Sequence, residues 1–106
     1  MEIKVNDYVR TDNGIIGKYK VNKNWINVIE TNNKDIGIDI EKDIVKHSNN
    51  IIDLIECGDY VNGVRILDIT GDYIHTDEWD CCKERLNKKI KSIVTHEQYS
   101  SLEYII

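Results

Sequence analysis

Short stretches of alternating apolar and polar residues follow one another along most of the chain. In residues 25–30 the alternation places Trp25, Asn27 and Ile29 on one face, and residues 36–40 alternate isoleucine with glycine or aspartate. A period of two is typical of β-strands, because successive side chains point to opposite faces of a sheet. Asn-Gly and Gly-Asp pairs between the stretches predict tight hairpin turns. The predicted strands cover residues 4–11, 15–21, 25–30, 36–40, 44–46, 59–61, 64–70, 73–78, 90–94 and 103–106.

Two short segments favour helix over strand. Residues 48–50 (Ser-Asn-Asn) are helix-capping types, and they predict one helical turn at residues 51–55. Thr95 predicts a second brief helix, with Gln98 at the capping-box position. For residues 79–89 the periodicity leaves a short helix and a long polar hairpin as open alternatives.

The beginning of the chain is repeated in its second half. Residues 3–9 read Ile-Lys-Val-Asn-Asp-Tyr-Val and residues 55–61 read Ile-Glu-Cys-Gly-Asp-Tyr-Val, 52 positions later. A second echo, Ile-Val-x-His, begins at Ile44 and again at Ile93, 49 positions later, which suggests that the second copy is about three residues shorter inside. Self-similarity of this kind indicates a repeated structural unit. We expect two repeats, at residues 1–54 and 55–106, the second with an insertion at 79–89.

The layout of each repeat predicts a particular all-β fold. Five short strands, tight turns and one helical turn before the last strand are typical of small SH3-like barrels. Units of about fifty residues bury too little surface to be stable alone, so we expect the copies to pack together. The prediction is two tandem SH3-like β-barrels packed side by side, with one or two short helical turns. A single β-sandwich formed by the two copies is the alternative.

Composition and charge narrow the classes of function. The net charge of −5 and the pI near 5.1 repel a phosphate backbone, so general nucleic-acid binding is not expected. The chain shows no signal peptide and no apolar run long enough for a membrane span, and its three cysteines suit a reducing compartment. We therefore expect a cytoplasmic protein without a membrane partner.

The charges of the second half fall into two blocks. The acidic block is Asp68, Asp72, Asp77, Glu78 and Asp80, and the basic block is Lys83, Arg85, Lys88, Lys89 and Lys91. A basic loop beside an aromatic ring can hold a phosphorylated ligand, because cationic groups bind phosphate oxygens while the ring stacks on a base. A solvated polar loop is the competing interpretation. The predicted ligand-binding residues are Trp25, Arg65, Tyr73, Trp79, Lys83, Arg85, Lys88 and Lys89.

Catalytic and metal-binding motifs are not found. No P-loop, Gly-x-Ser-x-Gly or His-Glu-x-x-His pattern occurs, and the carboxylates follow turns, so we expect a protein that is not an enzyme. His75, Cys81, Cys82 and His96 are possible zinc ligands, but adjacent cysteines rarely bind one metal, and we predict neither metal nor cofactor. The repeated Asp-Tyr-Val is interpreted as a folding requirement, in which the aspartate anchors a turn through a backbone N–H.

The block from Gly58 to Gly63 (Gly-Asp-Tyr-Val-Asn-Gly) and the segment from Ser92 to Gln98 (Ser-Ile-Val-Thr-His-Glu-Gln) carry a resemblance. The chain resembles small uncharacterised proteins encoded by prophages of low-GC Gram-positive bacteria. The resemblance implies a phage accessory gene, and small acidic β proteins from such genes are often inhibitors of host defence.

Residues and resemblance together give a ranked expectation of function. The first hypothesis is a phage counter-defence "sponge", a non-enzymatic homo-oligomer that sequesters a host immune signalling nucleotide. The alternative is an anti-CRISPR type of inhibitor that binds a host defence nuclease through the acidic block, whose charge would speed the encounter. An adaptor barrel that binds peptides is the third.

Overall fold

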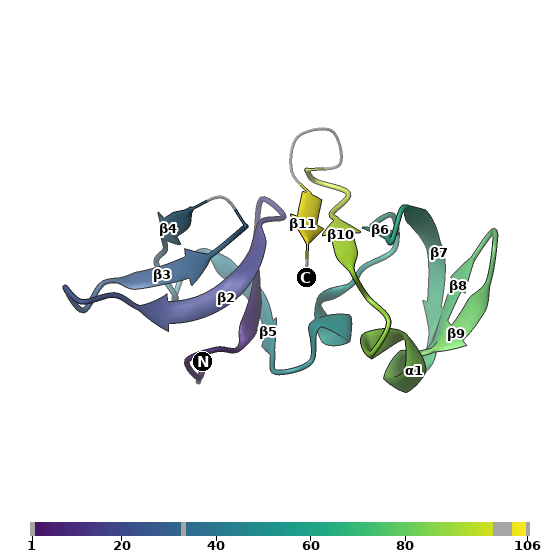
Figure 1. Ribbon diagram of the computed structural model, residues 1–106, viewed down its shortest axis with the longest axis horizontal. Coiled ribbons are helices and arrows are strands. Elements are labelled where there is room, and N and C mark those ends of the chain that lie inside the picture. Colours follow the sequence, from purple (N-terminus) through teal and green to yellow (C-terminus); the bar gives the residue numbers. More distant parts are fainter. Residues whose placement is uncertain (1, 33, 99–102, 106) are drawn as a thin grey trace. The chain divides into compact units, whose positions relative to one another are not determined.

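The computed structural model describes residues 2–32, 34–98 and 103–105. The chain divides into two compact units, Met1–Leu54 and Ile55–Ile106. Both units are built on a curled antiparallel sheet, with 43% strand and 9% helix in total (Figure 1). The prediction of a mainly β protein is therefore confirmed.

The first unit holds a five-stranded sheet in the order β4-β3-β2-β1-β5. Every pairing is antiparallel, so the chain forms a meander from β1 to β4 and then returns to place β5 beside β1. The 3-10 helix η1 (Ile51–Leu54) follows, where the capping residues predict a helical turn, and the Ser48 hydroxyl accepts the N–H of Asn50 at 3.0 Å. The strands are β1 (Tyr8–Thr11), β2 (Ile16–Val21), β3 (Asn27–Glu30), β4 (Asp35–Gly37) and β5 (Ile44–Ser48).

The alternating pattern builds the core of this unit. Val9, Tyr19, Ile29 and Ile44 are buried together, and five partly buried isoleucines pack against them. Burial of apolar side chains is the main favourable term in folding. Arg10 is also fully buried, and its guanidinium donates to the carbonyl of Leu54 at 3.0 Å, which joins β1 to the end of η1.

Three predicted strands of the first unit are too long, and one of them is 36–40, where β4 ends at Gly37. Strand β1 begins at Tyr8 and not at residue 4, because Asn6 has φ 78° and breaks the extended backbone. Strand β3 begins at Asn27, since Trp25 lies in the turn before it with φ 62° and a side chain that is 87% exposed. The alternating pattern at residues 25–30 therefore predicted too long a strand, because its first residues belong to a turn.

The second unit holds a six-stranded sheet in the order β11-β10-β6-β7-β8-β9. Five of its strands repeat the order of the first unit, with β6 to β9 as the meander and β10 beside β6; β11 then pairs with β10. Residues 96–98 form a turn, and the rest of the brief helix predicted after Thr95 lies outside the described residues. The strands are β6 (Tyr60–Val61), β7 (Val64–Thr70), β8 (Tyr73–Thr76), β9 (Asp80–Cys82), β10 (Ser92–Val94) and β11 (Glu103–Ile105).

The segment at 79–89, for which helix and hairpin were both open, contains a strand and a helix. Strand β9 pairs with β8 and holds the place that β4 has in the first unit. The short helix α1 (Lys83–Asn87) follows, and it buries Leu86. The part without a counterpart is therefore the helix, and not the whole of 79–89.

The repeated Asp-Tyr-Val motif occupies the same place in both units. The carbonyls of Asp7 and Asp59 each accept an N–H from the second strand of their sheet at 2.8 Å. Each carboxylate also accepts an N–H three residues earlier, from Lys4 at 3.1 Å and from Glu56 at 2.8 Å. The interpretation of this aspartate as the anchor of a turn is confirmed.

The second echo is not structurally equivalent. Val9 of β1 lies opposite His47, whereas Val61 of β6 lies opposite Ile93. Ile93 therefore takes the place of His47 and not that of Ile44, a displacement of three residues. Strand pairing fixes the register, and a short run of shared letters does not.

Candidate ligand pocket

A cavity of about 300 Å³ lies beside α1 in the second unit. This volume is at the lower end of the range for small-molecule sites. Its walls come from the start of β9, from α1 and from two turns. The lining residues are Trp79, Asp80 and Cys81, then Arg85 and Leu86, and finally Asn62 and Lys89.

The β6–β7 turn supplies one wall of the cavity. Asn62 and Gly63 form its two central residues with φ 52° and 82°, the positive values that an Asn-Gly pair accepts at little cost. The Asn62 side chain then holds the chain that follows α1. Its Oδ1 accepts the N–H groups of Lys91 at 2.7 Å and Ser92 at 3.1 Å, and its Nδ2 donates to the carbonyl of Lys89 at 3.0 Å.

The backbone of Trp79 is fixed by a threonine. The Thr76 hydroxyl accepts the N–H of Trp79 at 2.8 Å and donates to its carbonyl at 2.6 Å, which closes the turn between β8 and β9. The indole is half-buried and forms part of the cavity wall. An aromatic side chain in the wall of a cavity provides a surface on which a base can stack.

Two cations reach the same cavity from α1 and its end. Arg85 and Lys89 are four residues apart, a spacing that favours one side of a helix, and Leu86 next to Arg85 points into the core. Both cations are exposed, while Asp80, which also lines the cavity, lies 3.2 Å from the His75 ring. The cavity thus combines an indole, a guanidinium and an ammonium group with one carboxylate that has a partner of its own.

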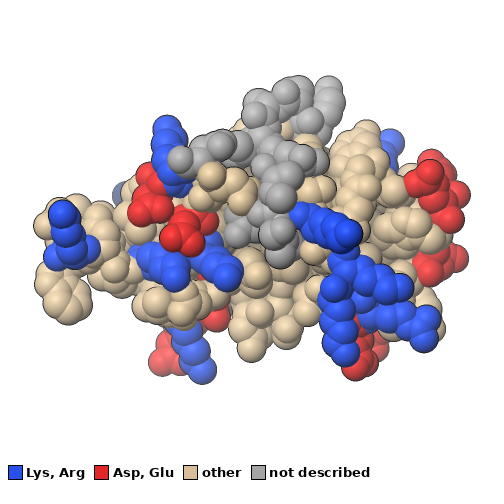
Figure 2. Space-filling model, viewed as in Figure 1, with Lys and Arg blue, Asp and Glu red and all other residues tan. Residues whose placement is uncertain are grey.

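A shallow, open groove adjoins the cavity and shares two of its residues. It is lined by Asn62, Gly63, Lys88, Lys89, Lys91 and Ser92, and encloses about 830 Å³. Figure 2 shows Lys and Arg gathered over the part of the second unit that holds α1, and Asp and Glu gathered toward the β8–β9 end. The acidic and basic blocks of the sequence are therefore separate on this face.

The structure brings together about half of the predicted ligand-binding residues. Trp79, Arg85 and Lys89 line the cavity, and Lys88 lines the groove. The other four lie elsewhere. Lys83 starts α1 and donates its N–H to the carbonyl of Asp72, Arg65 lines another cavity, Tyr73 stacks with His75, and Trp25 lies in the first unit.

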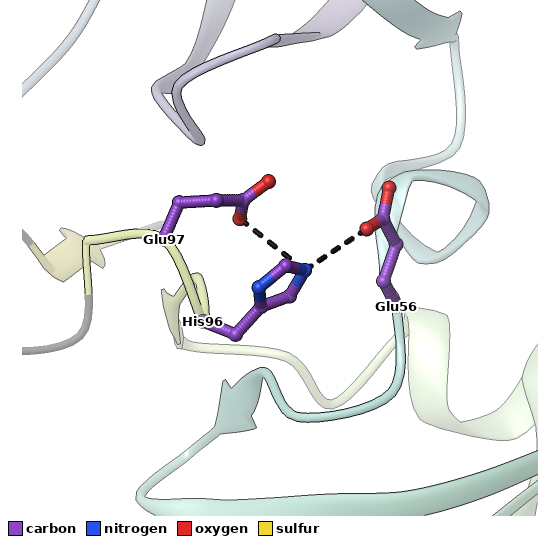
Figure 3. Close-up of side chains that lie close together, drawn as sticks. All are labelled: Glu56, His96 and Glu97. Carbon is purple, nitrogen blue, oxygen red and sulfur yellow. Dashed lines mark hydrogen bonds and ion pairs between the residues drawn. The ribbon is translucent and has the colours of Figure 1, made fainter.

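Sequence reasoning missed two features of the second unit. One is the Asn62 side chain, whose role in the turn was recognised but whose bonds to residues 89–92 were not. The other is the group Glu56, His96 and Glu97, whose ligand atoms lie within 4.8 Å of one another (Figure 3). It is the group among the described residues that can hold a metal ion. Of the four residues considered for zinc, it contains His96 and none of the others.

The comparisons with known proteins give no further guide. No protein-family model, curated protein or solved structure matches the chain significantly. Within the described residues, the helices are all too short to cross a lipid bilayer.

Proposed function

We propose that the chain is a non-enzymatic binding protein that sequesters a phosphorylated nucleotide. The observation that carries the proposal is the convergence of Trp79, Arg85 and Lys89 on one cavity, with a lysine-lined groove at its side. The residues provide the two contacts that such a ligand requires, a ring for the base and cations for the phosphates.

The proposed fold is a tandem of two SH3-like barrels. Both units have a four-strand meander whose fifth strand returns to pair with the first, and their turns before the first strand make the same hydrogen bonds. The curled sheets support this finer assignment. Packing of the two barrels on each other is part of the proposal.

The volume of the cavity limits which part of the ligand can enter it. A volume of about 300 Å³ suits a base with part of its sugar, so the phosphates of a cyclic di- or trinucleotide would lie along Lys88, Lys89 and Lys91. Stacking contributes about 1–3 kcal/mol per base, whereas nanomolar binding requires about 12 kcal/mol. Several phosphate contacts are therefore needed, and a second copy of the chain that covers the open groove would supply more.

The biological setting follows from the resemblance to prophage proteins. A phage protein that holds a host immune signalling nucleotide at nanomolar strength lowers its free concentration by mass action and keeps the host receptor inactive. Such a sponge acts in the cytoplasm of the infected bacterium and needs no catalytic group. The proposed protein is a counter-defence factor of this kind.

Calorimetry with a panel of cyclic di- and trinucleotides tests the proposal. We expect one nucleotide to bind, and Trp79→Ala to weaken it about tenfold to a hundredfold through the loss of stacking. Trp25→Ala is the matched control, since it removes an indole that is 87% exposed in the first unit and should leave binding unchanged. No heat and no thermal shift with any nucleotide would end the proposal. Native mass spectrometry of protein purified from its host would report the subunit count and any ligand retained.

A second candidate function rests on the acidic block. Asp68, Asp72, Asp77, Glu78 and Asp80 are all exposed on the β7–β8–β9 part of the second unit. Such a surface complements the basic channel of a defence nuclease, as an anti-CRISPR protein would require. A nuclease that is retained from host lysate at moderate salt by the wild type, but not after charge reversal of Asp77 and Glu78, would favour this function over nucleotide binding.

A further inference from the structure

We propose that Glu56, His96 and Glu97 bind a divalent cation of the first transition series, with Zn²⁺ as the representative ion. The site lies in the second unit and shares no residue with the lining of the cavity beside α1. It is independent of the nucleotide proposal, and neither function requires the other.

The spacing of the three side chains suits a single ion. The Nε2 atom of His96 lies 3.1 Å from Oε1 of Glu56 and 3.5 Å from Oε1 of Glu97. Zinc bonds to nitrogen and oxygen are about 2.1 Å long, which places neighbouring ligands of a tetrahedral ion roughly 3.4 Å apart. The observed separations lie on either side of this value, so the side chains need only small movements to admit an ion.

The types of donor atom point to a transition metal. The group consists of one imidazole nitrogen and two carboxylates, and Figure 3 shows the imidazole between the two carboxylates. Calcium and magnesium prefer oxygen ligands alone, whereas imidazole suits zinc, iron, copper and nickel. The histidine therefore distinguishes the group from an ordinary patch of surface acids.

A buried carboxylate holds two of the ligands in place. Asp59 is fully buried, and it accepts the N–H of Glu56 at 2.8 Å on one oxygen and the N–H of His96 at 2.9 Å on the other. Residues 40 positions apart are thereby held side by side before any ion arrives. Asp59 is a positioning residue in this site, in the manner of the outer partners that orient metal ligands.

The backbone at Gly58 brings the chain still closer to His96. Gly58 has φ +92°, and a Cβ atom added there would lie 3.3 Å from the Cβ of His96. His96 also lines a cavity of about 300 Å³ with Gly58, Tyr60 and Arg65. This space leaves room for water or a small anion as the remaining ligand of the ion, as three-ligand sites require.

The competing interpretation is a simple ion pair, in which a protonated His96 lies between two carboxylates without a metal. Titration of chelator-stripped protein with Zn²⁺ alone separates the two, by calorimetry and by the change in thermal unfolding temperature. We expect one ion per chain and a rise in unfolding temperature. His96→Gln, Glu56→Gln and Glu97→Gln should each weaken binding at least about tenfold, because each removes one of three ligands.

Three control variants locate the ion. His75→Gln removes another histidine that lies next to a carboxylate, Cys57→Ser removes the exposed thiol beside Glu56, and Trp79→Ala alters the other cavity; all three should keep wild-type affinity. Circular dichroism checks that every variant is folded. Absence of Zn²⁺ binding to the wild type would overturn the proposal. Binding that survives all three ligand substitutions, or that is lost with Cys57→Ser, would overturn it as well.

Discussion

The turns that precede the first strand of each unit share one hydrogen-bond pattern and differ in their side chains. In the first unit Asp7 is partly exposed, its carboxylate lies 3.7 Å from the His47 ring, and the residue that it anchors is Lys4. In the second unit Asp59 is fully buried and anchors Glu56 and the backbone of His96.

The difference places the proposed metal site at one of the two equivalent turns and not at the other. The shared bonds, from the aspartate to the backbone, form the turn in both units. The side chains around the anchoring aspartate differ between the units. The first unit has Lys4 where the second has Glu56, whose carboxylate lies beside the imidazole of His96. Among the described residues, only the second arrangement gathers three side chains that could hold a metal ion, although both turns line cavities, of about 300 and 330 Å³.

The largest expected effect comes from removing the anchors. Asp59→Ala removes a buried carboxylate and leaves the N–H groups of Glu56 and His96 without their acceptor. We expect it to lower the free energy of unfolding by about 3 kcal/mol. Asp7→Ala removes a more exposed partner and should cost about 1 kcal/mol. Urea unfolding measures both. Equal costs would show that the burial of Asp59 has no energetic consequence, and would weaken the contrast between the units.

The second effect concerns how closely two strands approach in the first unit. Gly17 is a residue of β2 and lies opposite Val9 of β1. A Cβ atom added at Gly17 would lie 2.6 Å from the carbonyl oxygen of Glu30 on β3. Gly17→Ala should therefore destabilise by about 1–3 kcal/mol, because backbone must move to relieve the overlap. The corresponding residue of the second unit, opposite Val61, is Val64. The close approach is therefore specific to the first sheet.

Gly37→Ala provides the control for this prediction. Nothing lies within 4 Å of a Cβ atom added at Gly37, which is also on a strand of the first unit. The substitution should change stability by less than about 0.5 kcal/mol, as expected for a surface site. If both alanine variants unfold at the same urea concentration, the overlap at Gly17 is relieved without cost.

The fold could be predicted from the sequence better than the candidate sites could. Period-two alternation and the Asn-Gly turn are local signals, and Asp7 and Asp59 share a motif long enough to mark equivalent positions. Trp79, Arg85 and Lys89 are close in sequence, so a short helix sufficed to bring them together. The Ile-Val-x-His echo gave a wrong equivalence, because three shared residues carry no information on which strand residues pair.

The metal-ligand group shows what sequence patterns cannot reveal. Glu56 and His96 are 40 positions apart, and their contact depends on β10 pairing with β6 and on the Asp59 carboxylate between their backbones. Neither residue belongs to a recognisable metal motif. The same holds for Asn62, whose place in a turn was evident while its bonds to a segment some 30 residues later were not.

The smallest expected effect concerns that asparagine. Asn62→Gly keeps a residue that accepts φ 52° but removes the side chain that binds the carbonyl of Lys89 and the N–H groups of Lys91 and Ser92. These bonds are exposed, so the loss of stability should be about 1 kcal/mol. Asn13→Gly in the β1–β2 turn of the first unit is the matched change. It should leave nucleotide affinity unchanged, whereas Asn62→Gly should weaken it severalfold by releasing Lys89 from the cavity wall. Urea unfolding and calorimetry with the bound nucleotide measure the two effects, and equal affinities for both variants would show that Asn62 does not shape the pocket.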